Sequence, residues 1–390
     1  MNIRNSKGSG PSTDPRPVRR RVTLLGLTAL VTAVCTLAGG ISVAQSASAS
    51  TAAPATATTS SGAKGGAGAL DPAQFHGVNW ADPRDNYVNG PVIPSGLSTG
   101  DNYATTYAKA HRILSQFRSD LGANTVRLPV NPYSVGTSWW TSYRAVIDAA
   151  RHDGFSVILS YWEGSSAEKD GRVDDPAAWY GMWNTLTSTF KADRRVYFEP
   201  MNEPFGYTAT EWEQLVTTWV DRYTAQGIPR NRIFVSGTGY NDHVNTVCGV
   251  AALDGTYVSQ HYYGFWGSHD AAGWAADFAS RLGDQECSAR TVLDEFGVPM
   301  TTGIDYTATP TTGNADADNS VAFLQAVTTI VRDRNLGAVY WPGLRTGDTY
   351  SLETLQGSGT RLSLSVNNPS GVDLLRWAWG YGHSAPFSAQ

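Results

Sequence analysis

The sequence lacks the signatures of nucleotide-binding and metal-dependent enzymes. No G-x-G-x-x-G or G-x-x-x-x-G-K-[ST] pattern follows an apolar run, so a dinucleotide-binding or P-loop protein is not expected. The seven histidines are scattered, without H-x-x-x-H spacing or a cysteine–histidine cluster. We therefore expect no cofactor and no metal site.

Positive charge is scarce once the N-terminal segment is set aside. Residues 1–49 hold six of the 29 Lys and Arg residues and one of the 34 Asp and Glu residues, so the remaining chain has a net charge of −10. An acidic chain without a basic stripe is a poor partner for nucleic acid. Nucleic-acid binding is therefore not expected.

Cysteine is also scarce, with three residues in the chain. Cys35 lies in the apolar N-terminal segment, which leaves Cys248 and Cys287 for the rest of the protein. In an exported protein, such a pair favours a disulfide over a metal site. Two free buried thiols are the alternative.

The N-terminal segment has the pattern of an export signal. Several arginines precede the uncharged run Val22–Val43, and the segment ends in the A-x-A sequence Ala47-Ser48-Ala49. We interpret residues 1–49 as a signal peptide for Sec or twin-arginine export. The protein is then secreted and extracellular, with no stable membrane association after signal cleavage. A transmembrane anchor formed by the same apolar run is the alternative.

Residues 50–69 form a low-complexity segment without any large apolar side chain. Such a segment buries too little surface to offset its ordering entropy, and we interpret it as a disordered linker. The rest of the chain, about 320 residues, suits one α/β barrel better than two small domains. Residues 70–385 are therefore interpreted as a single catalytic domain, and a monomer is expected.

The chain after the linker alternates short apolar runs with longer amphipathic segments. This order predicts a parallel sheet with crossover helices. Eight such units predict a closed (β/α)₈ barrel, the TIM barrel of the α/β class, with a doubly wound open sheet as the alternative. The predicted strands are Phe75–Ala81, Asn124–Val130, Ser156–Trp162, Val196–Glu203, Arg232–Tyr240, Tyr257–Gly264, Thr291–Gly297 and Gly337–Gly343. The predicted helices are Tyr103–Asp120, Ser138–Asp153, Pro176–Lys191, Thr210–Gln226, Ala271–Leu282 and Asp316–Arg334, with a short or broken helix near His243–Leu253.

Two of the predicted strands carry a glutamate at or near their carboxyl end. Strand four reads Glu199-Pro200-Met201-Asn202-Glu203-Pro204, and strand seven reads Asp294-Glu295-Phe296-Gly297. Cleavage of a glycosidic bond needs an acid that protonates the leaving oxygen and a second carboxylate on the other side. Strands four and seven of an eight-stranded barrel face each other, so Glu203 and Glu295 are predicted to converge on one sugar. Structural roles are expected for Glu199 and for Asp294, which strand alternation turns away from Glu295.

These segments resemble the cellulase family of retaining barrel enzymes, glycoside hydrolase family 5 of clan A, over about residues 72–380. The resemblance also rests on Arg127 after strand two, His261-Tyr262-Tyr263 after strand six and Trp341 after strand eight. It implies a retaining mechanism with Glu203 as general acid/base and Glu295 as nucleophile. It also implies a raised pKa for Glu203, a low pKa for Glu295, and carboxyl groups about 5–5.5 Å apart.

The resemblance implies roles for five further residues. Asn202 would hydrogen-bond the sugar 2-hydroxyl, and His261 would support the acid/base. Arg127 and Tyr263 would keep the nucleophile ionised, because a cation and a phenolic donor both favour a carboxylate. Trp341 would lie under the sugar at the point of cleavage.

The chain departs from the family pattern at the end of strand three. The family usually has a histidine there, in a sequence like Val-Ile-Leu-Asp-x-His, whereas this chain has Trp162. An indole offers a stacking face and one N–H donor, so the change bears on the substrate more than on the reaction. Glu163 follows and either binds sugar hydroxyls or is a solvated loop residue. Trp80, Trp162, Trp266 and Trp341 follow strands and are predicted to line the cleft, whereas the tryptophans of the predicted helices are expected in the core.

Three long loops follow strands one, seven and eight, at Asp82–Gly100, Val298–Asn314 and Leu344–Pro369. Loops of this length usually have a function. They either wall off one end of the cleft, for release of sugars from a chain end, or leave a groove that is open for internal cleavage.

The sequence therefore predicts an O-glycosyl hydrolase that cleaves a β-linked polysaccharide or oligosaccharide substrate by double displacement, with β-glucan as first choice and mannan next. One alternative is an exo-acting glycosidase on a less usual sugar, including furanosides. Another is a carbohydrate-binding barrel without catalysis. Transglycosylation uses the same residues with a sugar as acceptor and also stays open.

Overall fold

The computed structural model describes residues 70–388, apart from 165–168 and 311–315. The predicted signal peptide, residues 1–49, and the predicted linker, residues 50–69, lie outside the described residues and stay predictions. Within the described part of the chain, no helix combines the length and the apolar character needed to cross a membrane.

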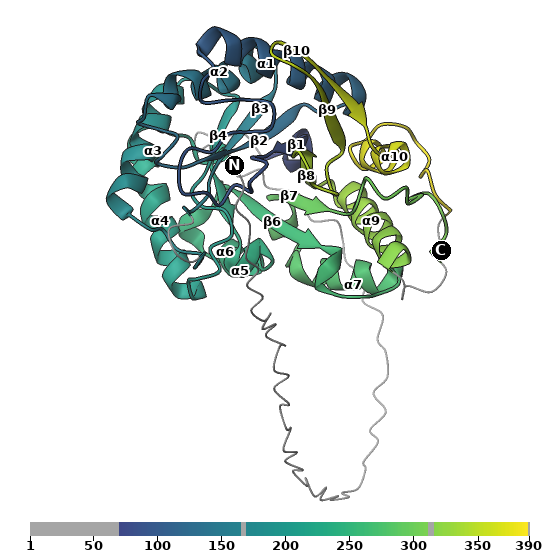
Figure 1. Cartoon of the computed structure of the whole chain (residues 1–390). Helices are drawn as coiled ribbons and strands as arrows, with labels where there is room; N and C mark the ends of the chain where they lie inside the picture. Colours follow the sequence, from purple (N-terminus) through teal and green to yellow (C-terminus); the bar gives the residue numbers. More distant parts are fainter. Residues whose placement is uncertain (1–69, 165–168, 311–315, 389–390) are drawn as a thin grey trace, which may run out of the picture. The chain divides into compact units, whose positions relative to one another are not determined.

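Eight parallel strands form a barrel surrounded by helices, which confirms the predicted (β/α)₈ fold (Figure 1). Their order is β4-β3-β2-β1-β8-β7-β6-β5, and a parallel bridge between Phe198 and Ile233 joins the β4 and β5 ends of this sheet. The strands are β1 (His76–Trp80), β2 (Thr125–Val130), β3 (Ser156–Tyr161), β4 (Val196–Glu199), β5 (Phe234–Ser236), β6 (Tyr257–Tyr263), β7 (Thr291–Gly297) and β8 (Gly337–Leu344).

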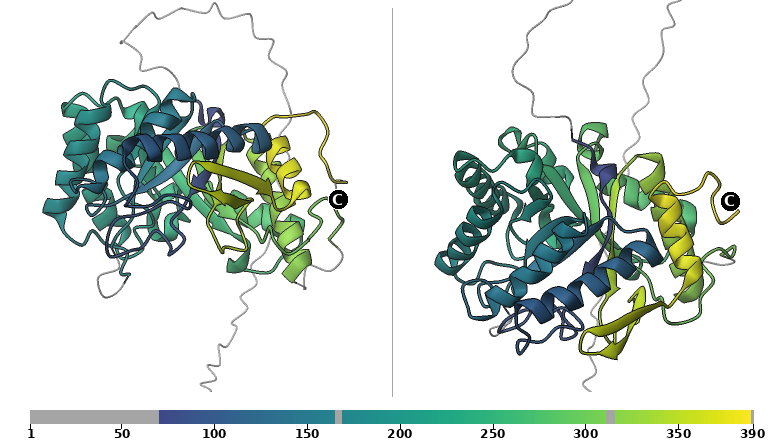
Figure 2. Two further views of the ribbon diagram at one scale, coloured as in Figure 1. Left: turned by 45° about the horizontal axis from the view of Figure 1, so that its top comes forward. Right: turned by 90° about the horizontal axis from the view of Figure 1, so that it is seen from above.

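The helices between the strands cover the outside of the barrel, as the two views of Figure 2 show. Their apolar faces pack on the strands, and the tryptophans of the predicted helices lie in this core as expected, with Trp140 partly buried. The helices are α1 (Tyr103–Gln116), α2 (Trp139–His152), α3 (Pro176–Phe190), α4 (Ala209–Ala225), α5 (Thr238–Asn241), α6 (Asn245–Cys248), α7 (Ala271–Arg281), α8 (Gln285–Ser288), α9 (Asp316–Asp333) and α10 (Pro369–Ala378).

An apolar layer fills the barrel near the amino ends of its strands. Phe75 packs edge-on against Tyr197 and Tyr257, with ring centroids 4.9 and 5.0 Å apart. Ile158, Val292 and Val339 are fully buried in the same cluster. This layer closes the barrel at the amino ends of its strands. A ligand can therefore reach the barrel interior only at the carboxyl ends of the strands, where active sites of this fold lie.

Strand four is shorter than predicted. β4 ends at Glu199, because the next residue, Pro200, has no amide hydrogen to donate to a neighbouring strand. Glu203, predicted as the last strand residue, therefore belongs to the loop that follows β4.

The segment predicted as a loop after strand eight contains a β-hairpin, made of β9 (Glu353–Ser358) and β10 (Arg361–Val366). The hairpin packs beside α1 (Figure 1), and the amide of Leu364 donates a hydrogen bond to Gln116 Oε1 at 2.6 Å. Alternate residues of β10, Leu362 and Leu364, are buried against the core. The interpretation of this whole segment as a loop was wrong.

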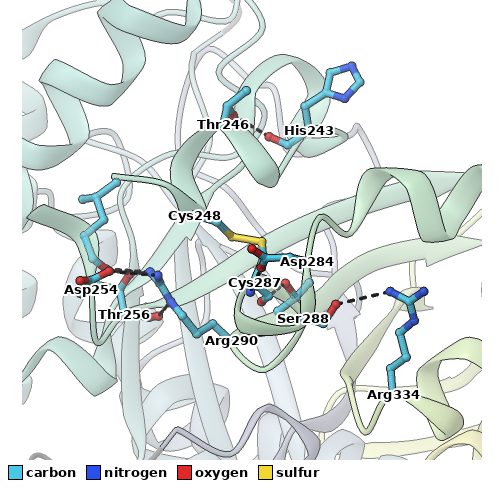
Figure 3. The surroundings of a disulfide bond; sticks show 12 residues. His243, Thr246, Cys248, Asp254, Thr256, Asp284, Cys287, Ser288, Arg290 and Arg334 are labelled. Carbon is cyan, nitrogen blue, oxygen red and sulfur yellow. Dashed lines mark hydrogen bonds and ion pairs between the residues drawn. A yellow bond between two sulfur atoms is a disulfide. The ribbon is translucent and has the colours of Figure 1, made fainter. Parts of the chain in front are cut away.

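The predicted disulfide joins Cys248, at the end of α6, to Cys287 in α8, with their Cα atoms 5.5 Å apart (Figure 3). Next to it, the Arg290 guanidinium donates hydrogen bonds to the carbonyl oxygens of Leu253 and Thr256, at 2.7 and 2.9 Å. The cross-link therefore ties the connection between β5 and β6 to the segment that precedes β7.

Candidate active site

Two glutamate side chains meet at the carboxyl end of the barrel. Glu295 belongs to β7, and Glu203 follows β4. Three atoms lie within 4.8 Å of one another: one carboxylate oxygen of Glu203, one carboxylate oxygen of Glu295 and one ring nitrogen of His261. His261 Nδ1 is 3.0 Å from Glu203 Oε1 and 3.8 Å from Glu295 Oε1. The structure thus brings together the two carboxylates that the sequence pattern pairs.

The backbone at Glu203 has a conformation that residues with a side chain rarely adopt. Its φ is 49°, in the left-handed region. Its amide donates a hydrogen bond to Asn241 Oδ1 at 3.1 Å, and Asn241 Nδ2 donates in turn to Ser259 Oγ at 2.7 Å. Backbone strain of this kind concentrates at functional sites, where surrounding contacts hold a side chain in position.

Arg127 of β2 contacts several buried acidic side chains, and Glu295 is one of them. Its guanidinium donates two hydrogen bonds to Glu199, at 2.7 and 2.8 Å, and one to Glu295 Oε2 at 3.1 Å. It also donates to Asn202 Oδ1 at 2.8 Å and lies 3.5 Å from Asp294 Oδ2. One positive charge therefore faces three buried carboxylates. Glu199, fully buried here, has the structural position expected for it.

A bulge in β7 places Asp294 inside the barrel. The pairing with β6 slips by one residue, so that His261 pairs with Glu295 and Asp294 is the extra residue. The Asp294 carboxylate accepts a hydrogen bond from Ser259 Oγ at 2.7 Å and faces Arg127. The expectation that strand alternation turns Asp294 away from Glu295 is wrong, because a bulge interrupts the alternation.

Burial sets the protonation of Glu203 and His261. It raises the pKa of Glu203 to about 7, although the hydrogen bond from Tyr87 and the charge of Arg127 lower it. This agrees with the raised pKa expected of an acid/base. Burial also lowers the pKa of His261 to about 4, so its ring is neutral at pH 7.

Burial likewise raises the pKa of Glu295, because it outweighs the charge of Arg127 and the hydrogen bond that the Tyr263 hydroxyl donates to Glu295 Oε1 at 2.8 Å. The expectation of a low pKa for Glu295 is therefore wrong. The donors implied by the resemblance are in place, but the carboxylate also sits close to Glu203 and is almost fully buried.

A cavity of about 430 Å³ opens above the two glutamates, and both line it. Trp162, Trp266 and Trp341, three of the four tryptophans predicted for the cleft, also line it. Trp162 and Trp341 stack with their ring centroids 5.4 Å apart.

Trp80 and Glu163 do not line this cavity. Trp80 is fully buried in the core, where its ring packs edge-on against Phe117, and its indole N–H donates a hydrogen bond to the carbonyl oxygen of Ser95 at 2.9 Å. Glu163 is fully buried and accepts a hydrogen bond from the amide of Arg172 at 2.9 Å. The predicted place of Trp80 in the cleft is wrong, and Glu163 is neither a cavity residue nor a solvated one.

Comparison with known proteins agrees with this geometry. The family described as Cellulase (glycosyl hydrolase family 5) matches residues 88–342. The chain belongs to glycosyl hydrolase family 5. Comparison with curated proteins gives no match.

Solved structures similar to this family 5 enzyme share its fold at low sequence identity. The catalytic domain of the major endoglucanase from Xanthomonas campestris pv. campestris is 17% identical, with a TM-score of 0.56, over 78% of this chain and 94% of that one. An endo-β-1,4-glucanase from Xanthomonas axonopodis pv. citri with a triple mutation is 19% identical, with a TM-score of 0.54, over 78% and 99%. A hyperthermophilic endocellulase from the archaeon Pyrococcus horikoshii is 15% identical, with a TM-score of 0.55, over 78% and 92%.

The remaining predicted residues of the glycoside hydrolase divide into two groups. Tyr263 lines the cavity and contacts Glu295. Asn202, Arg127 and His261 are fully or almost fully buried behind the two glutamates and do not line the cavity. These three act on the site through other side chains in this structure.

Tyr87 is a residue of the site that sequence reasoning missed. It lies in the loop after β1, and its hydroxyl donates a hydrogen bond to Glu203 Oε2 at 2.8 Å. The same hydroxyl accepts a hydrogen bond from Asn202 Nδ2 at 3.0 Å, so it takes one of the two N–H donors of the amide that the resemblance assigns to the sugar 2-hydroxyl. The one available signal was the length of the loop, which carries no periodic pattern that would orient a single tyrosine.

The Tyr87 hydrogen bond predicts a pH effect. It lowers the pKa of Glu203, so Tyr87→Phe raises that pKa and keeps the acid protonated to higher pH. We expect the alkaline limb of kcat/KM to move to higher pH, and kcat/KM at the optimum to fall about tenfold, the effect of losing a hydrogen bond to a charged group. Tyr350→Phe, at another cavity-lining tyrosine, is the control in which the limb stays in place. An unmoved limb in Tyr87→Phe would contradict this role.

Proposed function

We propose that this family 5 glycoside hydrolase cleaves β-linked glucan by double displacement, with retention of the anomeric configuration. The observation that carries the proposal is the approach of the two carboxylates, with one oxygen of Glu203 and one of Glu295 within 4.8 Å. Retaining enzymes have carboxyl groups about 5–5.5 Å apart, whereas inverting enzymes need about 6.5–9.5 Å to admit a water molecule.

The surroundings of the two glutamates support different roles. Glu295 accepts hydrogen bonds from Arg127 and Tyr263, which both favour the anion that a nucleophile must be. Glu203 has a pKa of about 7, so much of it is protonated at neutral pH, as a general acid requires. We therefore assign Glu295 as nucleophile and Glu203 as acid/base.

The reaction then has two steps. Glu295 attacks the anomeric carbon while Glu203 gives its proton to the leaving oxygen, which yields a glycosyl-enzyme and a free chain end. Glu203, now a carboxylate, takes a proton from water, and the water oxygen attacks the anomeric carbon and releases Glu295. Both steps invert the configuration, so the product keeps that of the substrate.

Two observations support a β-glucan substrate. The cavity walls carry the indole rings of Trp162, Trp266 and Trp341, and sugar C–H faces stack on such rings. The similar solved structures are named as endoglucanases and endocellulases.

The test is hydrolysis of aryl β-glycosides and soluble polysaccharides followed by ¹H NMR. We expect turnover of β-glucosides and β-glucan, with the β-anomer of the released sugar appearing before mutarotation. An α-anomer as first product would overturn retention. Turnover of β-mannosides or furanosides, with no turnover of β-glucosides, would contradict the proposed β-glucan substrate and would leave the proposed mechanism unaffected.

We also propose that the protein acts outside the cell. The predicted signal in residues 1–49 motivates this, and the Cys248–Cys287 disulfide supports it, because such bonds persist in oxidising compartments. N-terminal sequencing of the protein from culture medium tests it, with Ser50 as the expected first residue. An intact N-terminus on cell-bound protein would contradict export with cleavage.

A further inference from the structure

The two ends of the active-site cavity differ in exposure. At the end formed by the loops after β5 and β6, Tyr240 and Phe265 are 48% and 65% exposed. At the other end, Trp162 and Trp341 are 2% and 7% exposed and stack on each other. The volume of about 430 Å³ is near the small end of the usual range for ligand pockets, about 300–1,000 Å³.

A bridge of partly exposed charged side chains connects three loops at the end of the cavity that holds Trp162 and Trp341. Asp85, in the loop after β1, has its Oδ2 atom 3.5 Å from Lys169 Nζ, in the loop after β3. The same oxygen lies 3.9 Å from Arg345 Nη2, in the loop after β8. Arg345 Nη1 contacts Asp348 Oδ2 at 2.9 Å, so the bridge continues into a fourth side chain.

The bridge lies directly against the catalytic side chains. Lys169 Nζ is 4.3 Å from the centroid of the Tyr87 ring, whose hydroxyl bonds Glu203. The Tyr87 ring also packs edge-on against Trp162, with centroids 4.7 Å apart. Aromatic rings and ion pairs therefore form one continuous wall beside the acid/base.

The loop after β1 has a fixed structure that holds this wall in place. Asp82 is fully buried, and its carboxylate accepts hydrogen bonds from the amides of Arg84 and Ile93, at 2.8 and 2.7 Å. Asp85 has a φ of 80°, and its Oδ1 accepts a hydrogen bond from the amide of Asn86 at 2.7 Å. Loops pinned by buried carboxylates keep a defined shape.

We infer that this wall closes the cavity behind a single sugar, so that the enzyme removes monosaccharides from the non-reducing end of a β-linked chain. The inference rests on the proposed function and on the family resemblance, which implies that the sugar being cut lies over Trp341, at the walled end. A further sugar on its non-reducing side meets Tyr87, Asp85 and Arg345. The leaving part of the chain extends over the exposed rings of Tyr240 and Phe265.

Blocked substrates test the inference directly. An aryl β-cellotrioside with a free non-reducing end is compared with the same compound carrying a 4,6-O-benzylidene group at that end, which needs space beyond a terminal sugar. We expect the blocked compound to react at least about a hundredfold more slowly, and β-glucan to give glucose from the first minute with little loss of viscosity. Equal rates, or an early ladder of oligomers, would overturn exo action.

Variants of the wall make the test specific to these loops. Asp85→Gly combined with Arg345→Ala removes the bridge, and glycine suits the positive φ at position 85. We expect the rate on the blocked compound, relative to the free one, to rise at least tenfold. Arg230→Ala, at the opposite end of the barrel, is the control in which this ratio stays constant, and thermal unfolding shows that each variant is folded.

The two proposals fail in different ways. If the parent cleaves free and blocked compounds equally, exo action is wrong and glycoside hydrolysis stands. A constant ratio in a folded wall variant also overturns the assignment of the wall. If the parent cleaves no β-glycoside, the proposed function is wrong, and the inference of exo action, which depends on it, is wrong as well.

Discussion

Replacing Glu295 by alanine is expected to lower kcat about 10⁴- to 10⁶-fold on aryl β-glucosides, the range for loss of an attacking nucleophile. The fold is expected to survive, because Arg127 keeps its two hydrogen bonds to Glu199 and its ion pair with Asp294. Initial rates and thermal unfolding on the same preparation measure both effects. The remaining Glu203 can still protonate the leaving oxygen, but no carboxylate attacks the anomeric carbon.

The configuration of the product formed with azide tests the role of the carboxylate that Glu295→Ala removes. The vacated space lies on the side of the sugar opposite the leaving group, so azide enters there and displaces the aryl group in one inverting step. The product is an α-glycosyl azide, and NMR distinguishes it from the β-form. Asp294→Ala is the matched control, since Asp294 also faces Arg127 but does not line the cavity. A β-azide from Glu295→Ala would reverse the roles of the two glutamates.

The strands were predictable because parallel strands are buried on both faces and read as apolar runs. The same reasoning placed Glu295 near the carboxyl end of β7, and the family pattern placed Glu203 opposite it. Side-chain direction was harder to predict. In β1, Asn79 points into the barrel, where its amide donates to the carbonyl oxygen of Asp294 at 2.9 Å. Strand alternation then turns Trp80 outward, so the alternation rule would have corrected the prediction for Trp80.

The same rule gave the wrong answer in β7, which is separated from β1 by β8. In β7 the bulge adds a residue, and both Asp294 and Glu295 contact Arg127. Nothing in the local sequence marks a bulge, because it depends on pairing with β6. Tyr87 and Asp85 were missed for a related reason. Their positions follow from a loop held by hydrogen bonds to Asp82, and such loops have no periodicity to read.

Replacing Glu203 by alanine is expected to give a loss that depends on the leaving group. An acid supplies about 10²- to 10⁴-fold where the leaving oxygen needs a proton. The first step should therefore be almost unchanged for 2,4-dinitrophenyl β-glucoside and should fall by that factor for phenyl β-glucoside and for cello-oligosaccharides. A burst of dinitrophenol followed by slow turnover is the expected time course, because no base assists the second step. Equal losses on both aryl substrates would contradict the acid role.

Two further measurements on Glu203→Ala test the acid/base role: the configuration of the azide product and the pH dependence of kcat/KM. The glycosyl-enzyme on Glu295 forms normally, and azide then attacks it from the side that Glu203 has left, so the product is a β-glycosyl azide. The pKa of Glu203, about 7, sets the alkaline limb of the parent, because the deprotonated form cannot donate. In the variant, kcat/KM for the dinitrophenyl substrate should stay level as the pH rises through this value, whereas in the parent it falls for phenyl β-glucoside. A retained alkaline limb in Glu203→Ala would assign that ionisation to another group.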